Sequence, residues 1–260
     1  MSIQYLLYLL CKPSHSYKHK RLKNKSTSHA RQSHEYDELI KEISEYTGFD
    51  RRSIESKHKQ LVGQVGQKNY DLMSEEELVS FYRETEYHFY AAPMWNASCG
   101  RTSYLVWSIT SYLRSNKYKT ILDFGAGGGE LCMALAQQGF SVHYVDVNKA
   151  LIDFSRWRFK RRNLDIKIIA NDEVNAYTFD AVISFDVFEH LKNLPQKIKD
   201  ISRLIKPGGS LVFSIELSGG GLHLEENKVY SNQKMINEIL EDSGLTFDWR
   251  FKGIFFYKRR

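Results

Sequence analysis

The chain has few of the residues that mark secreted or membrane-spanning proteins. Three cysteines and four prolines occur in 260 residues. Cys11, Cys99 and Cys132 show neither paired spacing nor the spacing of a zinc site. No apolar run reaches the roughly 18 residues of a membrane span. These absences indicate a reducing compartment, and we expect a cytoplasmic protein.

Acidic residues are missing from the start of the chain. No Asp or Glu occurs from Met1 to His34, and this segment holds much of the basic excess behind the formal net charge of +6. The remainder is nearly balanced, so net charge alone does not indicate a nucleic-acid-binding protein. We expect residues 1–34 to form a flexible basic arm. Its apolar first ten residues lack a cleavage site, which leaves weak membrane contact as an alternative to a frayed terminus.

Helical patterns follow the arm. Apolar residues recur at helical spacing from Tyr36 and stop before Gly48, and a second helix is expected from Arg51 to Val62. Ser74 followed by Glu77 forms a capping-box pattern that predicts the start of a third helix. Residues 35–98 are therefore predicted to form a helical N-terminal cap.

Short apolar runs alternate with helical stretches from residue 99 to residue 260. This alternation predicts right-handed crossovers and a parallel sheet. The last two runs are close enough in sequence to form an antiparallel hairpin. The expected strands are 121–124, 141–147, 166–170, 181–185, 210–215, 245–251 and 253–257, and the expected helices are 103–115, 131–136, 150–161, 194–205 and 233–241.

A glycine-rich turn follows the first of these strands. Gly125, Gly127 and Gly129 separate it from a helical pattern, which predicts a turn where a nucleoside-containing ligand lies against the backbone. The dinucleotide fingerprint needs a glycine where Glu130 stands. Asp123, two residues before the first glycine, would repel a pyrophosphate and suits a ligand that carries an ammonium and a sulfonium.

At this turn the chain resembles the class I S-adenosylmethionine-dependent methyltransferases. Residues 179–191 are similar to the Phe-Asp-x-Val and Glu-His-Leu segment of the small-molecule methyltransferases, including the ubiquinone-biosynthesis group. Residues 203–214 are similar to their Leu-Lys-Pro-Gly-Gly turn. The resemblance covers about residues 100–260. It implies S-adenosylmethionine as cofactor and a Rossmann-like, seven-stranded, mostly parallel sheet with a C-terminal antiparallel hairpin.

The resemblance also implies which residues hold the cofactor. Asp146 closes the second strand, where its carboxylate can accept both ribose hydroxyls, although dinucleotide enzymes also place an acid there. Asp172 follows the third strand, where the family often binds the adenine amino group, and Asn171 and Glu173 are also eligible. The expected cofactor-binding residues are Asp123, Gly125, Ala126, Gly127, Gly129, Asp146, Val147, Asp172, Phe185, Asp186, Tyr90 and Trp95.

Two histidines are candidates for a general base. Methyl transfer needs donor and acceptor to be aligned, and a hydroxyl acceptor must also lose its proton. His190 follows the fourth strand, although in this family the Glu-His pair often shapes the pocket. His223 lies on a glycine-flanked loop after the fifth strand, where a solvated role is the alternative. No His and carboxylate cluster has a persuasive ligand spacing in the sequence, so we expect no metal.

The predicted function is methyl transfer to oxygen or nitrogen of a small molecule. The Asn/Asp-Pro-Pro-Tyr element of amino-group methylases is absent, since Ser184-Phe185-Asp186-Val187 stands there, and this disfavours nucleic acid as substrate. One alternative is an RNA or protein methyltransferase that uses the basic arm for binding. Another is a non-catalytic cofactor-binding scaffold subunit. The sequence carries no signal for an oligomeric state.

Overall fold

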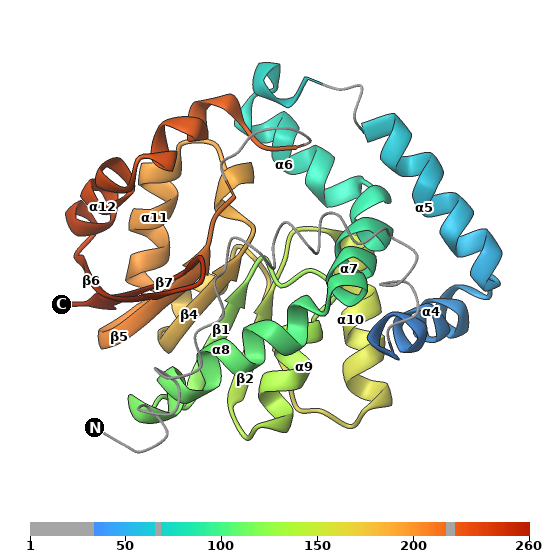
Figure 1. Ribbon diagram of the computed structural model, residues 1–260, viewed down its shortest axis with the longest axis horizontal. Coiled ribbons are helices and arrows are strands. Elements are labelled where there is room, and N and C mark those ends of the chain that lie inside the picture. Colours follow the sequence, from blue (N-terminus) through green and yellow to red (C-terminus); the bar gives the residue numbers. More distant parts are fainter. Residues whose placement is uncertain (1–33, 66–68, 217–221) are drawn as a thin grey trace.

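The computed structural model describes residues 34–65, 69–216 and 222–260. They form a seven-stranded sheet flanked by helices (Figure 1). The basic arm up to residue 33, with Cys11, and the glycines at 219–221 lie outside these residues. The strand order is β3-β2-β1-β4-β5-β7-β6. The strands are β1 (Thr120–Phe124), β2 (Ser141–Val145), β3 (Lys167–Ile168), β4 (Phe179–Phe185), β5 (Ile205–Ser214), β6 (Leu245–Phe251) and β7 (Ile254–Arg259).

The strand directions confirm the predicted fold class. The first five strands pair in parallel, whereas β7 runs antiparallel to both β5 and β6. One boundary differs clearly from the expectation, because β5 begins at Ile205 and not at Ser210. Ile205 pairs with Phe179 and Ser210 pairs with Ala181, so the register shifts between these two pairs. The Pro-Gly pair in residues 206–209 therefore makes an irregularity within β5 and does not end the strand.

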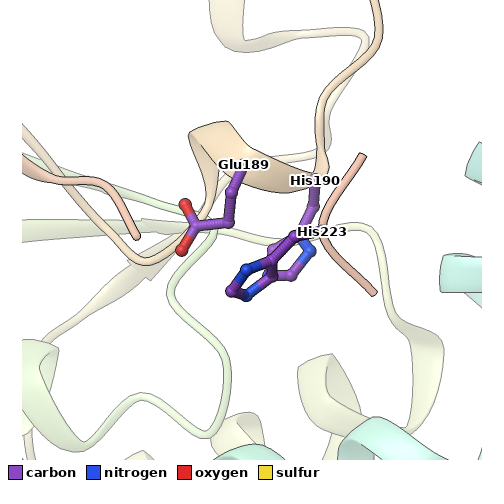
Figure 2. Close-up of side chains that lie close together, drawn as sticks. All are labelled: Glu189, His190 and His223. Atoms are coloured by element: carbon purple, nitrogen blue, oxygen red, sulfur yellow. The ribbon is translucent and has the colours of Figure 1, made fainter. Parts of the chain in front are cut away.

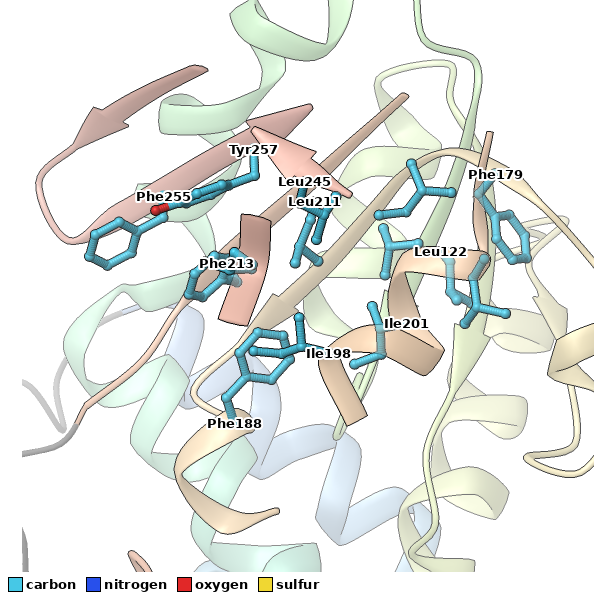
Figure 3. Packing of buried hydrophobic residues seen from close by; sticks show 14 of the residues in the cluster. Leu122, Phe179, Phe188, Ile198, Ile201, Leu211, Phe213, Leu245, Phe255 and Tyr257 are labelled. Carbon is cyan, nitrogen blue, oxygen red and sulfur yellow. The ribbon is translucent and has the colours of Figure 1, made fainter. Parts of the chain in front are cut away.

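Helices cover both faces of the sheet (Figure 1). Adjacent strand residues point to opposite faces, so Leu122 packs in one apolar cluster and Ile121 in the other. The cluster with Leu122 includes Ile198 and Ile201 and is drawn in Figure 3. The helices here are α8 (Arg101–Ser115), α9 (Glu130–Gln137), α10 (Lys149–Arg161), α11 (Leu194–Arg203) and α12 (Gln233–Asp242), with short 3-10 turns η2 (Val174–Ala176), η3 (Phe188–His190) and η4 (Glu225–Ser231).

The N-terminal helices form a cap with its own apolar core. Ile43, Ile54 and Phe89 pack there against Phe154 of α10, which attaches the cap to the sheet domain. The capping box at Ser74 is present as predicted, at the start of the third cap helix. The cap elements are α4 (His34–Thr47), α5 (Arg51–Val65), η1 (Tyr70–Leu72), α6 (Glu75–Glu84) and α7 (Tyr87–Cys99).

Helix α7 lies within the predicted helical cap, but no separate helix was expected over its residues. Its buried residues lie on several sides of the helix, and Pro93 lies inside it. A helix without a polar face gives no stripe of apolar residues, and an internal proline argues against a helix, so the local pattern is weak. Within the described ranges, no helix combines the length and the apolarity that crossing a bilayer requires.

Candidate active site

The glycine turn between β1 and α9 leaves one glycine open to a ligand. Gly125, Gly127 and Gly129 all have positive φ angles. A Cβ atom at Gly125 would lie 2.5 Å from Cγ2 of Val187, and one at Gly129 would lie 2.7 Å from the ring of Phe159. Among the described residues, and apart from its two chain neighbours, no atom lies within 4 Å of the Cβ position of Gly127. A larger residue at Gly125 or Gly129 would therefore collide with its neighbours, whereas Gly127 can lie directly against a bound molecule.

Asp146 holds this turn in place. Its Oδ2 accepts a hydrogen bond of 2.8 Å from the backbone N–H of Gly127, and its Oδ1 accepts one of 2.8 Å from that of Asn148. A carboxylate has about four lone-pair sites, so at least one stays available to a ligand. Burial raises the pKa of Asp146, and the backbone N–H groups of Asn148, Gly127 and Val147 oppose that shift. The half-buried carboxylate fits the predicted role as acceptor of ribose hydroxyls.

Asp123 lies beneath the turn. It is 4% exposed, and the thiol of Cys132 donates to its Oδ2 at 3.2 Å. Burial raises its pKa to about 7, and the negative charges of Asp146 and Glu130 add to the shift. Direct contact between Asp123 and a cationic ligand stays a prediction.

The other predicted cofactor residues are spread more widely. Asp172 is exposed in the turn after β3. Tyr90 is 1% exposed in the cap core, with its ring centre 4.8 Å from that of Phe89. Trp95 is 53% exposed. Cofactor contact by these residues stays a prediction, as it does for the partly buried Ala126, Val147 and Phe185.

An ion pair lies directly after the carboxyl end of β4. Asp186 follows the strand with a φ of +56°, and its carboxylate accepts hydrogen bonds of 2.9 and 2.7 Å from Nη2 of Arg101. The hydroxyl of Ser214, at the end of β5, donates to the same carboxylate at 2.7 Å. Arg101 was not predicted, because it lies 85 positions away from Asp186 and no local pattern marks it.

Beside this pair, the structure brings both predicted histidines together with a glutamate (Figure 2). The ring centres of His190 and His223 are 5.1 Å apart. Glu189, which the sequence analysis did not select, is 1% exposed. Burial raises the pKa of Glu189 to about 8, and the charge of Asp186 adds to this. One ligand atom from each of Glu189, His190 and His223 lies within 4.8 Å of the others.

Both histidines are kept neutral. Burial lowers the pKa of His190 to about 4, and burial also lowers that of His223. Nδ1 of His190 lies 3.1 Å from the carbonyl oxygen of Leu222. A carbonyl oxygen only accepts hydrogen bonds, so Nδ1 carries the proton and Nε2 keeps a lone pair. The cluster thus offers neutral nitrogen bases beside a buried carboxyl group.

The chain segment after β5 fixes this cluster. The side-chain amide of Asn227 donates to the carbonyl oxygens of Phe188, Glu189 and Leu191, at 3.2, 3.3 and 2.9 Å. The backbone N–H of Leu224 donates to the carbonyl oxygen of Glu189 at 3.0 Å. Asn227 therefore orients the turn that carries Glu189 and His190, a role that the sequence did not indicate.

The cap is fastened to the site by Asn148. Its side-chain amide donates to the carbonyl oxygens of Tyr82 and Thr85 at 2.8 and 2.9 Å, and its Oδ1 accepts from the N–H of Leu151. One side chain thus caps α10 and holds the end of α6. The sequence could have indicated the capping role of Asn148, because Asn is a common N-cap and this one directly precedes the predicted helix.

The parallel sheet, the open glycine turn and the acid at the end of β2 define a nucleoside-binding protein of the Rossmann-like class. A family model described as a methyltransferase domain matches residues 101–246, which is more than half of the chain. The chain belongs to the S-adenosylmethionine-dependent methyltransferase family.

Curated relatives match part of the chain. It is 38% identical over 105 residues to a ubiquinone biosynthesis O-methyltransferase of Coxiella burnetii, covering 38% of this chain and 44% of that protein. It is 33% identical over 118 residues to the protein of the same name from Rickettsia akari, covering 44% and 47%. The chain thus spans less than half the length of these relatives.

A solved structure supports the fold. The magnesium protoporphyrin IX methyltransferase of Synechocystis PCC 6803, crystallised with bound S-adenosylmethionine, aligns with a TM-score of 0.54 at 18% identity. The alignment covers 74% of this chain and 100% of that one. At this identity the likeness concerns the fold alone.

Proposed function

We propose that this chain transfers the methyl group of S-adenosylmethionine to an oxygen or nitrogen of a small molecule, with a hydroxyl oxygen as the favoured acceptor. The observation that carries the proposal is the position of the neutral His190 and His223 on the turn and loop that follow β4 and β5, beside the open glycine turn. The names of the relatives from Coxiella burnetii and Rickettsia akari support an oxygen acceptor.

Different residues bind the cofactor and accept the proton. Gly127 lets the cofactor lie against the backbone, and Asp146 accepts hydrogen bonds from its ribose hydroxyls. The bound cofactor supplies an electrophilic methyl group on a sulfonium. Because Val187 packs against Gly125, the turn that carries His190 is held next to the glycine turn. In the absence of a bound ion, one unprotonated nitrogen of His190 or His223 then accepts the proton of the acceptor hydroxyl.

Cofactor binding is the first test. Calorimetric titration with S-adenosylmethionine and S-adenosylhomocysteine is expected to give one site, and Asp146→Ala is expected to weaken binding by at least about tenfold, since it removes charge-assisted hydrogen bonds. Asp153→Ala, which removes an exposed carboxylate on α10, serves as matched control and should bind normally. Absence of binding to a folded wild-type protein would overturn the proposal.

Transfer itself is tested with cofactor labelled in the methyl group. Small phenols, alcohols and amines are offered as acceptors, and the labelled product is separated and counted. Label on a phenol or alcohol that depends on Asp146 supports oxygen transfer. Label found only on amines would contradict the favoured acceptor, and label found only on RNA or protein would contradict the small-molecule assignment.

A further inference from the structure

We propose that Glu189, His190 and His223 bind a divalent transition-metal ion at the position of the methyl acceptor. One ligand atom from each side chain lies within 4.8 Å of the other two (Figure 2). Metal binding rests on these three side chains alone, whereas a role for the ion in methyl transfer rests also on the proposed function.

The spacing suits a shared ion after small side-chain movements. Ligand atoms bind zinc tetrahedrally at about 2.0–2.2 Å, so two of them on one ion stand roughly 3.4 Å apart. Each side chain therefore needs to move by less than about 1 Å. The ring centres of His190 and His223 are already 5.1 Å apart, and the loop carrying His223 adjoins the turn that carries His190.

The cluster contains buried polar atoms that lack partners. Among the described residues, Oε2 of Glu189 and Nδ1 of His223 are buried and have no hydrogen-bond partner. The Glu189 side chain is almost wholly buried. A buried carboxylate oxygen without a partner costs free energy unless a ligand compensates it. A bound cation supplies that compensation at both atoms.

Two of the three proposed ligands are oriented by hydrogen bonds through the atoms that would not bind the ion. Nδ1–H of His190 donates to the carbonyl oxygen of Leu222 at 3.1 Å, which leaves Nε2 free to coordinate. Oε1 of Glu189 accepts from the backbone N–H of Glu216 at 3.3 Å. Metal-binding imidazoles and carboxylates are commonly oriented by such hydrogen bonds. Two of the three ligands are therefore positioned before an ion arrives.

The ligand types select the class of ion. Two imidazole nitrogens and one carboxylate suit zinc and neighbouring transition metals, whereas calcium and magnesium prefer sites made wholly of oxygen. The negative charge of Asp186 acts on all three ligands and adds to the attraction for a cation. Zinc is the ion we expect to bind most tightly among zinc, manganese and magnesium.

Three protein ligands leave a coordination position for the acceptor. A hydroxyl oxygen bound there would lose its proton more readily; because the histidine nitrogens then hold the ion, water and not a histidine accepts that proton. The oxygen forms its new bond to the methyl carbon while the carbon–sulfur bond breaks. The electron pair of that bond stays on sulfur, which becomes a neutral thioether. The ion thus makes the hydroxyl a better nucleophile at neutral pH.

Metal titration of the full chain tests the site. Protein treated with a chelator is titrated calorimetrically with zinc chloride, and we expect one equivalent to bind. Glu189→Gln and His223→Ala are each expected to weaken binding by about 100-fold, as loss of a ligand should cost at least as much as loss of an outer hydrogen bond. His34→Ala, which removes an exposed histidine at the start of α4, is the matched control and should bind like the wild type.

A spectrum of the wild-type protein keeps the test independent of how the variants fold. Cobalt(II) added to the stripped protein should give visible absorption bands of a nitrogen-ligated ion, and zinc should displace them. Bands that never form, or zinc affinity that is equal in the wild type, Glu189→Gln and His223→Ala, would overturn the metal site. S-adenosylhomocysteine binding is measured on the same samples, so failure of the metal site and failure of the cofactor site are seen separately.

Discussion

The guanidinium of Arg158 is buried against the carboxylate of Glu42, and this ion pair joins the cap to the glycine turn between β1 and α9. Nε of Arg158 donates to Oε2 of Glu42 at 3.0 Å, and Nη1 donates to the carbonyl oxygen of Gly128 at 2.6 Å. Glu130 and Arg162 extend the network on either side. A helix of the cap and the glycine turn thus share one buried cation.

Glu42→Gln is expected to destabilise the protein strongly. Removing one partner of a buried ion pair costs about 3–5 kcal/mol. Glu130 still faces Arg158, so we expect a loss of about 2–4 kcal/mol in the free energy of unfolding, measured with urea. Glu45→Gln removes a half-exposed partner of Arg161 and should cost less than about 1 kcal/mol. Equal losses in the two variants would contradict a structural role for the buried pair.

Two substitutions of Asn148 should separate its two functions. Asn148→Ser keeps a side chain that caps α10 but loses the donors to Tyr82 and Thr85. Asn148→Ala loses the cap as well. Leaving two carbonyl oxygens without donors is expected to lower the free energy of unfolding by about 1–3 kcal/mol in the serine variant. The alanine variant should lose about 1 kcal/mol more.

Limited proteolysis checks where Asn148 acts. In the serine variant, cleavage is expected to increase between α6 and α7, next to Thr85, because the end of α6 is no longer held. An exposed amide provides the control, since Gln196→Ser on α11 should leave the cleavage pattern unchanged. A cleavage pattern of Asn148→Ser identical to that of the wild type would show that the two hydrogen bonds do not fasten the cap.

Most of the fold was predictable from local patterns in the sequence. The strand and glycine turn at Asp123 to Gly129, the capping box at Ser74 and the final hairpin each depend on neighbouring residues, so their spacing predicts them. Helix α7 was missed because its buried residues form no single stripe. The elements that were predicted are helices with one periodic buried face and short apolar strands bounded by turn residues.

Long-range pairs in the site were not predictable in the same way. Arg158 and Glu42 are 116 positions apart, and Arg101 and Asp186 are 85 positions apart. Nothing in the sequence near Arg158 marks it as a partner of a cap residue. His190 and His223 were both selected, because the ends of parallel strands meet at one edge of a sheet. Their contact with Glu189 depends on side-chain positions that only the folded chain fixes.

Asp180 is expected to make stability depend on pH in the acid range. Burial acts to raise its pKa, but Lys206 and the N–H groups of Thr120 and Lys119 outweigh burial and hold the pKa well below its usual range. A carboxylate with a depressed pKa stabilises the fold above its unfolded pKa of about 3.9, and this contribution is lost as the pH falls further.

Asp180→Asn tests this dependence. At pH 7 the variant should lose about 1–2 kcal/mol in the free energy of unfolding, a value reduced for the 21% exposure of the side chain. The difference from the wild type should shrink as the pH falls below about 4. Asp153→Asn, an exposed control, should stay within about 0.5 kcal/mol of the wild type at every pH. A difference for Asp180→Asn that is the same at pH 3 and pH 7 would show that its charge is not the cause.

Gly127→Ala should separate folding from cofactor binding. The position has a φ of +56°, and among the described residues beyond its chain neighbours no atom lies within 4 Å of the added Cβ. The expected cost is therefore the strain of a left-handed alanine, about 1–2 kcal/mol. Gly139→Ala carries the same kind of strain, with a φ of +88° and no atom within 4 Å, at a turn before β2. Both variants are expected to lose similar stability in urea unfolding. Only Gly127→Ala should lose affinity for S-adenosylhomocysteine in calorimetry, because its methyl group occupies space that the ligand needs. Normal binding by Gly127→Ala would mean that the cofactor does not lie against this glycine.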